Sequence, residues 1–335
     1  MARICIIGGA GFIGRSLAAQ LVAQQHSVVI PTRHREWAKR GLIMLPTVDL
    51  VEADVHDPAA LTRLFAGCDA VINLIGVLHS KSGSPYGPGF AHAHVELPKK
   101  IIAACRQARV PRLIHIGALG SAADAPSEYL RSKADGEAAV MAAANDLHVT
   151  VFRPSVVFGR DDAFLNLFAG RLSPADPGDA GRQLMVFLQR FALFMPLPGA
   201  TAKLQPVHVE DVAQAIVRSL EDDNAFGKTY TLVGPTVYTL EQLVRYAQSL
   251  AGRPIPILRL GARLGMVQAA LLECAPGKLM SRDNLRSLSA PNVSSEPFPF
   301  GIKPVTLEAV APGYLAGVWP RSRYDRYRNR AGRHT

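Results

Sequence analysis

The chain of 335 residues has only four cysteines, and it has no long uninterrupted hydrophobic run. Cys5, Cys68, Cys105 and Cys274 are scattered without a Cys-x-x-Cys pair, which argues against a zinc or disulfide framework and for reduced thiols in a cytoplasm. No stretch reaches the ~18 apolar residues that a transmembrane helix needs. Because the N-terminus begins directly with a strand-like segment, we expect no signal peptide.

Acidic residues are also scarce, with 27 Asp and Glu against 37 Lys and Arg, which gives a formal net charge of +10. Half of this excess lies in residues 319–335, where arginines alternate with aromatic residues. Such a segment suits an anionic membrane surface or an acidic protein face, and a disordered solubilising tail is the alternative. Nucleic acid is the least favoured partner. We therefore expect a cytoplasmic protein, with peripheral contact to the inner face of the membrane left open.

A glycine motif opens the chain. Residues 3–7 are apolar as in a buried strand, residues 16–25 have helical periodicity, and Gly-Gly-Ala-Gly-Phe-Ile-Gly stands between them at 8–14. This order predicts a dinucleotide-binding turn, in which backbone N–H groups at a helix N-terminus face a pyrophosphate. The alternative is a tight turn that only packs a helix on a sheet. The predicted cofactor contacts in the turn are Gly8, Gly11, Phe12, Ile13 and Gly14.

The second predicted strand, at residues 27–30, is followed by a basic segment. In dinucleotide folds an acidic residue at this strand end binds the ribose 2′-OH of NAD, whereas arginine pairs with the 2′-phosphate of NADP. Thr32 and Arg33 stand here, more basic residues follow, and Glu36 is the only nearby acid. The sequence therefore favours NADP(H) over NAD(H), with a solvated basic loop as the alternative.

Strands and helices continue to alternate to about residue 160. This alternation predicts an α/β fold of the Rossmann type, a doubly wound parallel sheet with a smaller C-terminal substrate lobe. We expect residues 1–160 to form the dinucleotide-binding domain, with 203–220 returning to it. The smaller substrate or partner lobe is expected at 161–202 and 221–318, and a basic, disordered tail at 319–335.

Tyr129 and Lys133 form a Tyr-x-x-x-Lys pair at the start of a helix predicted at residues 129–144. Residues four apart share one helix face, and a nearby ammonium stabilises a phenolate and lowers the phenol's pKa. The pair therefore predicts acid–base chemistry, with the lysine also holding the nicotinamide ribose. The alternative is a tyrosine that only holds the cofactor or begins the helix.

Together these motifs resemble the short-chain dehydrogenase/reductase superfamily, in its extended and atypical branches. The resemblance implies further cofactor contacts from the ends of the third and fourth strands and from two later positions. These residues are Asp54, Val55, Leu74, Ile75, Gly76, Lys133 and Pro154.

Other segments resemble one atypical branch, which holds the nucleotide-binding accessory subunit of respiratory complex I and its bacterial NAD-dependent epimerase/dehydratase-like relatives. The resemblance covers the chain to about residue 315 and implies association with a respiratory or quinone-pathway protein complex. The segments are residues 118–120, 127–133, 153–159, 164–166, 205–212, 300–304 and 307–310.

One position departs from the pattern of the catalytic members, which carry Ser or Thr directly after the fifth strand. Gly117 and Ala118 stand there, and Ser121 is the nearest hydroxyl. Loss of one donor to a substrate oxygen can cost ~10²–10³ in rate. The sequence therefore predicts a cofactor-binding protein with weak or no turnover.

The competing hypothesis is an active reductase, epimerase or dehydratase. Tyr129 would be its acid–base residue, Lys133 would lower the tyrosine pKa, and Ser121 would replace the missing donor. Its substrate would be a nucleotide sugar or a quinone or isoprenoid intermediate. We predict no metal site, because His92 and His94 lack carboxylate or cysteine partners in the sequence.

Overall fold

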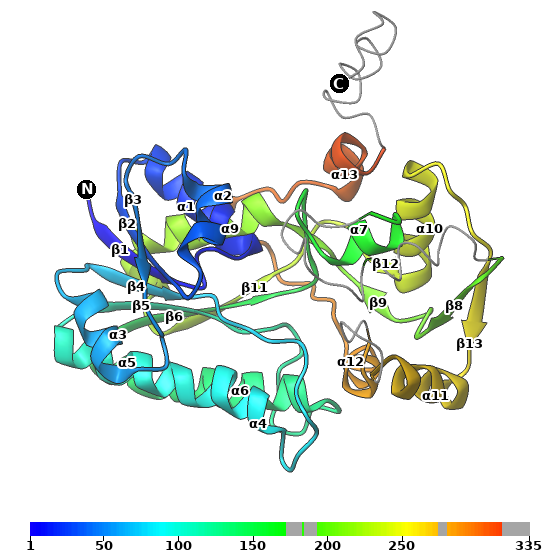
Figure 1. Cartoon of the computed structure of the whole chain (residues 1–335), viewed down its shortest axis with the longest axis horizontal. Coiled ribbons are helices and arrows are strands. Elements are labelled where there is room, and N and C mark those ends of the chain that lie inside the picture. Colours follow the sequence, from blue (N-terminus) through cyan, green and yellow to red (C-terminus); the bar gives the residue numbers. More distant parts are fainter. Residues whose placement is uncertain (172–182, 184–192, 274–279, 317–335) are drawn as a thin grey trace, which may run out of the picture.

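In a computed structural model of the chain, residues 1–171, 183, 193–273 and 280–316 are described. The centre of the fold is a seven-stranded parallel sheet in the order β11-β6-β5-β4-β1-β2-β3 (Figure 1). The order reverses between β1 and β4, and ligands of such sheets bind beyond the carboxyl ends of the strands at this reversal. The strands are β1 (Arg3–Ile7), β2 (Ser27–Thr32), β3 (Val48–Glu52), β4 (Ala70–Asn73), β5 (Arg112–Ile116), β6 (His148–Pro154) and β11 (Lys228–Leu232).

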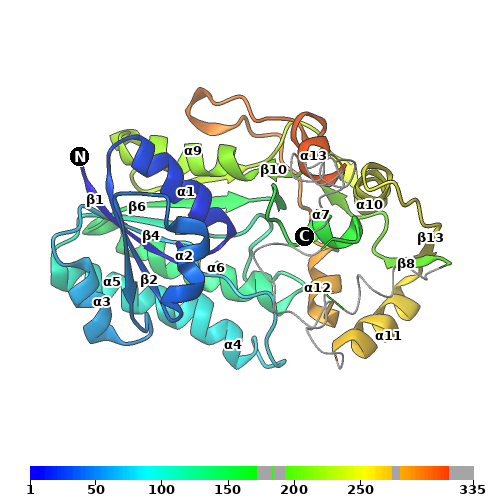
Figure 2. The ribbon, with the colours of Figure 1, turned by 45° about the horizontal axis from the view of Figure 1, so that its top comes forward.

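Helices cover both faces of this sheet, as Figures 1 and 2 show. One face carries α1 (Phe12–Ala23), α2 (Arg35–Leu42) and α9 (Val209–Leu220), and the other carries α3 (Pro58–Phe65), α5 (Leu97–Ala108) and α6 (Glu128–Met141). Side chains alternate between the faces along each strand, so that Ile4 and Ile6 join the core with α1 and α9, whereas Cys5 and Ile7 join the core with α3 and α5. The predicted doubly wound α/β fold is confirmed.

Two features of the helices were not indicated by the sequence. The basic segment after β2, for which a solvated loop was the alternative, contains α2, of which only Ala38 and Leu42 are buried among the hydrophobic residues. Two buried positions give too little apolar periodicity to reveal a helix. The helical segment before β5 begins as α4 (Pro88–Phe90) and a π-helix, η1 (Ala91–Glu96), before α5.

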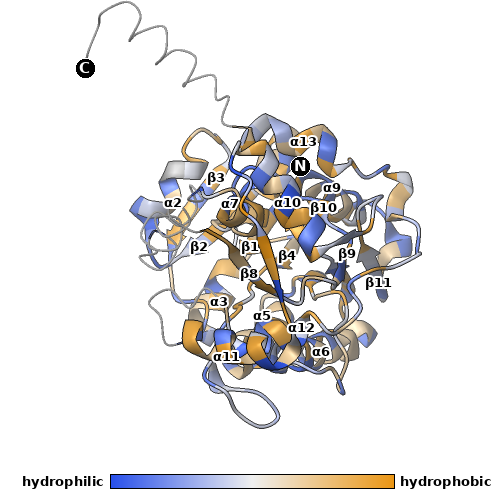
Figure 3. Cartoon of the chain, turned by 90° about the vertical axis from the view of Figure 1, so that its right-hand side faces the viewer, coloured by the Kyte–Doolittle hydropathy of each residue, from blue (hydrophilic) through white to orange (hydrophobic). Residues whose placement is uncertain are grey.

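The smaller lobe has its own core, which includes Leu197, Leu243 and Leu315. α11 turns Leu264, Val267 and Leu271 to the solvent, and its apolar residues are coloured orange in Figure 3. None of the described helices is long and apolar enough to cross a membrane. The remaining elements are η2 (Ala142–Asn145), β7 (Val157–Phe158), α7 (Phe164–Phe168), β8 (Met195–Pro198), β9 (Lys203–Leu204), β10 (Val207–His208), η3 (Asp223–Ala225), β12 (Tyr238–Thr239), α10 (Leu240–Leu250), β13 (Ile257–Leu260), α11 (Ala262–Glu273), α12 (Arg282–Ser287), η4 (Pro299–Gly301) and α13 (Leu307–Leu315).

The large sheet takes one strand that the predicted domain boundaries assigned elsewhere. Residues 221–318 were expected in the smaller lobe, but β11 pairs in parallel with β6, from Lys228 opposite Thr150 to Leu232 opposite Pro154. The reason is that α9 packs against α1 on the large sheet, so the strand that follows it returns to the sheet edge. The predicted basic tail lies outside the described residues.

Candidate cofactor site

The glycine turn lies between β1 and α1, and its glycines are needed for its close packing. Gly8 has a φ of +85°, which favours glycine, and an ideal Cβ on Gly14 would lie 2.4 Å from the carbonyl oxygen of Gly9. The N-cap of α1 is Gly11, so no N-cap side chain accepts a hydrogen bond from the first amides of the helix. The first turn of the helix contains no acidic residue. The amide groups and the dipole of this helix end therefore favour an anion.

The next two residues of the predicted turn contribute packing as well as backbone. Phe12 and Ile13 are half-buried at the start of α1. The Phe12 ring lies 3.2 Å from the position of an ideal Cβ on Gly159, and Ile13 packs against the core beneath α1 and α9. Their side chains therefore hold the helix on the sheet while their backbone forms the predicted anion site.

The carboxyl ends of β2 and β3 lie side by side. Thr32 is opposite Glu52 in the strand register, and Arg33 and Glu52 are both exposed. The Thr32 hydroxyl accepts a hydrogen bond from the His34 N–H at 3.2 Å. Sequence reasoning considered only Glu36 as a competing acid and missed Glu52, which becomes a neighbour of Arg33 only through strand pairing.

The loop after β3 carries Asp54 and Val55, the two cofactor contacts predicted there. Asp54 is exposed, and its carboxylate accepts a hydrogen bond from the His56 N–H at 2.9 Å. This bond forms an Asx turn that fixes the loop, with Val55 half-buried behind it. The structure therefore places both residues at the same sheet edge as Thr32 and Arg33.

The glycine turn, the end of β4 and α6 converge. Leu74 donates its N–H to the last carbonyl of β1 at 2.9 Å. An ideal Cβ on Gly8 would lie 3.2 Å from the Ile75 side chain, and one on Gly76 would lie 3.4 Å from the Nζ atom of Lys133. The structure thus brings together residues from three predicted motifs at the point where the strand order reverses.

The helix with Tyr129 is capped from two directions. The Ser127 hydroxyl accepts a hydrogen bond from the Leu130 N–H at 3.2 Å. The buried carboxylate of Asp283, on α12, accepts from the Glu128 N–H at 2.7 Å and from the Tyr129 N–H at 3.0 Å. Nothing in the local sequence of either segment indicated this contact, because Asp283 reaches α6 only through the packing of the smaller lobe.

Lys133 and Tyr129 do not form the expected electrostatic pair. The Lys133 ammonium donates to the Ile116 carbonyl oxygen at 2.9 Å, and burial lowers its pKa to about 8, partly opposed by Glu137. Burial raises the pKa of Tyr129 to about 12. The predicted lowering of the tyrosine pKa is therefore wrong, because the ammonium faces a carbonyl while the phenol ring packs against Phe90 and His94.

Ser121 does not offer its proton to a ligand. Its buried hydroxyl donates a hydrogen bond to the Ala118 carbonyl oxygen. The buried Pro154 lies beside this loop, and its carbonyl accepts from the Leu119 N–H at 3.0 Å. Ser121 and Pro154 therefore shape the loop after β5, and the hydroxyl predicted to replace the missing donor is used inside the turn.

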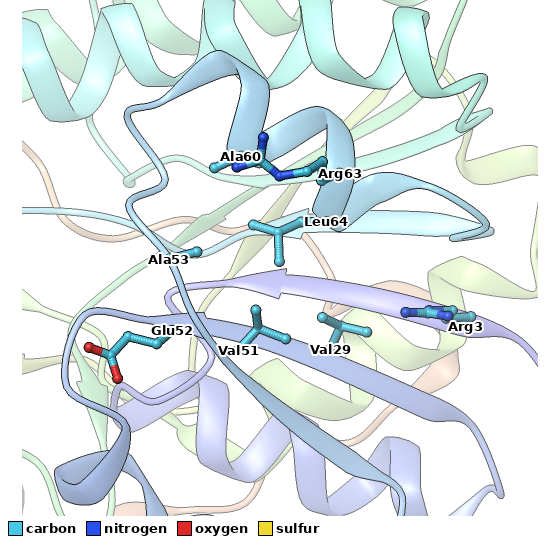
Figure 4. A pocket seen from close by; sticks show the side chains of 8 residues that line it. All are labelled: Arg3, Val29, Val51, Glu52, Ala53, Ala60, Arg63 and Leu64. Atoms are coloured by element: carbon cyan, nitrogen blue, oxygen red, sulfur yellow. The ribbon is translucent and has the colours of Figure 1, made fainter.

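A pocket of about 220 Å³ lies between α3 and the strands β1, β2 and β3 (Figure 4). Its lining includes Glu52 at the end of β3 but no residue of the glycine turn or of α6. Its lining residues are Arg3, Val29, Val51, Glu52, Ala53, Ala60, Arg63 and Leu64.

His115 is a buried residue of β5. Its Nδ1 atom lies 3.1 Å from the Asn73 Nδ2 atom, which can only donate, so Nδ1 is the acceptor and Nε2 carries the proton. The Nε2 atom has no hydrogen-bond partner among the described residues. Burial, with a smaller contribution from Lys133, lowers the pKa of His115 to about 3.

We expect His115 to make the protein sensitive to acid. Its folded pKa of about 3 lies below the ordinary value of 6.5, so between these pH values the unfolded chain binds more protons and the free energy of unfolding falls as the pH falls. The slope from one such group is at most ~1.4 kcal/mol per pH unit. Urea unfolding from about pH 7 to pH 4.5 should show a smaller slope for His115→Leu than for the wild type. Equal slopes would contradict the assignment.

The fold and the site define a dinucleotide-binding α/β protein of the Rossmann type. The sequence profile of the NAD dependent epimerase/dehydratase family matches residues 4–232, and the chain belongs to this family.

The relatives of the chain fall into more than one functional group. The NADH dehydrogenase (ubiquinone) 1 alpha subcomplex subunit 9 of Arabidopsis thaliana mitochondria is 31% identical over 243 residues, which is 71% of this chain. The match spans 55% of that relative's length. A ceramide reductase of Caulobacter vibrioides is 26% identical over 268 residues, covering 77% of this chain and 73% of that protein. The predicted resemblance to the complex I accessory subunit is confirmed.

Among solved structures, a dTDP-glucose 4,6-dehydratase from Streptomyces venezuelae with NAD and TYD bound has a TM-score of 0.62. It is 20% identical, and the match covers 77% of this chain and 84% of that one. At this level of identity the likeness shows a shared fold.

Proposed function

We propose that the protein holds NADP(H), in preference to NAD(H), at the carboxyl ends of β1, β2 and β4, with weak or no turnover. The observation that carries this proposal is the convergence of the glycine turn, the β4 end and α6, where Gly8 lies against Ile75 and Gly76 against Lys133. The helix end at Gly11 is suited to the pyrophosphate. Arg33 supports the preference for a 2′-phosphate.

The loop after β5 supports weak turnover. When bound, the cofactor supplies a hydride at the nicotinamide. The protein must then hold a substrate oxygen beside Tyr129, but Gly117 and Ala118 have no hydroxyl and Ser121 donates to the Ala118 carbonyl. Lys133 keeps its ammonium on the Ile116 carbonyl, close to the β4 end, where it can hold a ribose hydroxyl.

We further propose that this cofactor-binding protein associates with a respiratory or quinone-linked complex. The name of the Arabidopsis relative, a subunit of NADH dehydrogenase, supports this partner class. The net charge of +10, half of which lies in residues 319–335, fits an acidic protein face. A cytoplasmic location with peripheral contact to the inner face of the membrane fits the same charge.

A second candidate function is an active reductase. The Tyr129 hydroxyl has no hydrogen-bond partner within the described ranges, which leaves it available to a substrate oxygen. The similarity to a protein named as a ceramide reductase makes a ceramide-like lipid a substrate class to test beside nucleotide sugars and quinone or isoprenoid intermediates.

The nucleotide carried by the purified protein distinguishes the two functions. We expect mass spectrometry of an extract to identify NADP(H), and we expect slow exchange with added labelled NADP(H). Free exchange together with reduction of a carbonyl substrate that Tyr129→Phe abolishes would favour the reductase. If neither extracted nor added dinucleotide is found on the protein, the proposed cofactor site is wrong.

A further inference from the structure

His94 links the end of β4 to the helix that carries Tyr129. It is 1% exposed and lies in the π-helix η1, on the segment between β4 and α5. The Val77 N–H donates to its Nε2 atom at 3.0 Å, and its Nδ1 atom lies 2.8 Å from the Ser132 hydroxyl. The Ser132 hydroxyl donates in turn to the Tyr129 carbonyl oxygen at 2.8 Å.

The directions of these hydrogen bonds follow from chemistry. A backbone N–H can only donate, so the Nε2 atom of His94 must be an unprotonated acceptor. The proton of the neutral ring is therefore on Nδ1, which donates to Ser132, while Ser132 uses its own proton on Tyr129. Burial, with smaller contributions from Lys133 and His115, lowers the pKa of His94 to about 2, so the ring stays neutral.

The His94 ring packs between two aromatic side chains. It stacks on Phe90 with ring centroids 5.5 Å apart, and it meets the Tyr129 ring edge-on at 5.5 Å. The backbone of η1 contacts α6 directly, because an ideal Cβ on Gly136 would lie 1.8 Å from the His94 carbonyl oxygen. A π-helical turn of this kind is rare and is found frequently at functional sites.

We infer that His94 is a positioning residue for the nicotinamide half of the cofactor site. It holds the backbone at Gly76 and Val77 in register with Tyr129 and Lys133, and an ideal Cβ on Gly76 would lie between its Nε2 atom at 3.9 Å and the Lys133 Nζ atom at 3.4 Å. The inference rests on the proposed function. Within the described part of the chain, the hydrogen bonds of the His94 ring go to Val77 and Ser132 and none reaches β2 or β3, so the adenine half is independent of it.

Two ligands separate this role from a general loss of structure. NADPH needs both halves of the site, whereas ADP needs only the adenine half. In titration calorimetry of the full chain, we expect His94→Leu to weaken NADPH binding about tenfold, the effect of losing one or two hydrogen bonds, and to leave ADP binding unchanged. The matched control is His26→Leu, which also removes an acceptor of a backbone N–H but at the amino end of the sheet.

Conservative variants identify the contact that matters. His94→Gln can place an amide oxygen near the position of Nε2 and accept from Val77, whereas His94→Asn is too short to do so. We expect the Gln variant to bind NADPH more tightly than the Asn variant. This comparison decides the question if His94→Leu does not fold.

Three results would overturn the inference. Unchanged NADPH binding in His94→Leu would show that the contact does not position the cofactor. An equal loss of ADP and NADPH binding would show a structural role alone. If the wild type bound ADP and NADPH with the same affinity, or bound neither, the proposed function would fail first and the role of His94 would fail with it.

Discussion

Gly14→Ala is expected to weaken dinucleotide binding about 100-fold and to destabilise the fold. The new Cβ would lie 2.4 Å from the Gly9 carbonyl oxygen and 2.5 Å from its Cα atom, so the turn and α1 must separate. Overpacking of this kind costs about 1–3 kcal/mol. The displaced helix end would lose one or more charge-assisted hydrogen bonds to the pyrophosphate, which corresponds to a loss in affinity of about 100-fold.

Urea unfolding and NADPH titration measure the two effects, and Gly261→Ala is the control. Gly261 has no positive φ, and nothing lies within 4 Å of the position of its ideal Cβ. We expect this control to keep both stability and affinity. Normal NADPH binding by Gly14→Ala would show that the cofactor does not use the glycine turn.

Arg33→Ala is expected to remove the preference for NADPH over NADH. Arg33 follows the end of β2 and is exposed, so it is free to pair with a 2′-phosphate. A hydrogen bond between charged groups contributes about 1.5–3 kcal/mol, so NADPH affinity should fall about 10- to 100-fold while NADH affinity stays the same. Titration of each variant with both cofactors measures the change.

Substitution of Glu52 removes a negative charge beside the position where Arg33→Ala removes a positive one. It lies opposite Thr32 in the register of β2 and β3 and is exposed. Its negative charge opposes a 2′-phosphate, so Glu52→Gln should bind NADPH as well as the wild type or better. If Arg33→Ala leaves NADPH binding unchanged and Glu52→Gln weakens NADH binding, the cofactor is NAD(H).

The large sheet was predictable because most of its strands can be recognised from their own residues. The strands from β1 to β6 are short apolar runs, and the helices between them, except α2, have clear periodicity. β11 lies among residues that were assigned to the smaller lobe, because the sequence does not state which sheet a strand will join. The helix α2 was missed because it buries too few apolar residues.

The site was predictable only where its residues belong to local motifs. The glycine turn, the β4 end and the Tyr129–Lys133 helix meet as the parallel topology requires. The cap from Asp283, the bridge through His94 and the inward hydroxyl of Ser121 depend on tertiary packing. The lysine was expected to act on the tyrosine, but its actual partner is a backbone carbonyl on β5, which no sequence pattern can indicate.

The Asp283 carboxylate also sets the order in which the site can be completed. Its two hydrogen bonds to the start of α6 join residues 155 and 154 positions apart. A growing chain whose large sheet has already formed still lacks this cap. Two N–H groups in the first turn of α6 therefore have no protein acceptor until α12 has been synthesised and has docked. The helix that carries Tyr129 therefore gains this cap only after the cofactor-binding turn at the N-terminus has been synthesised.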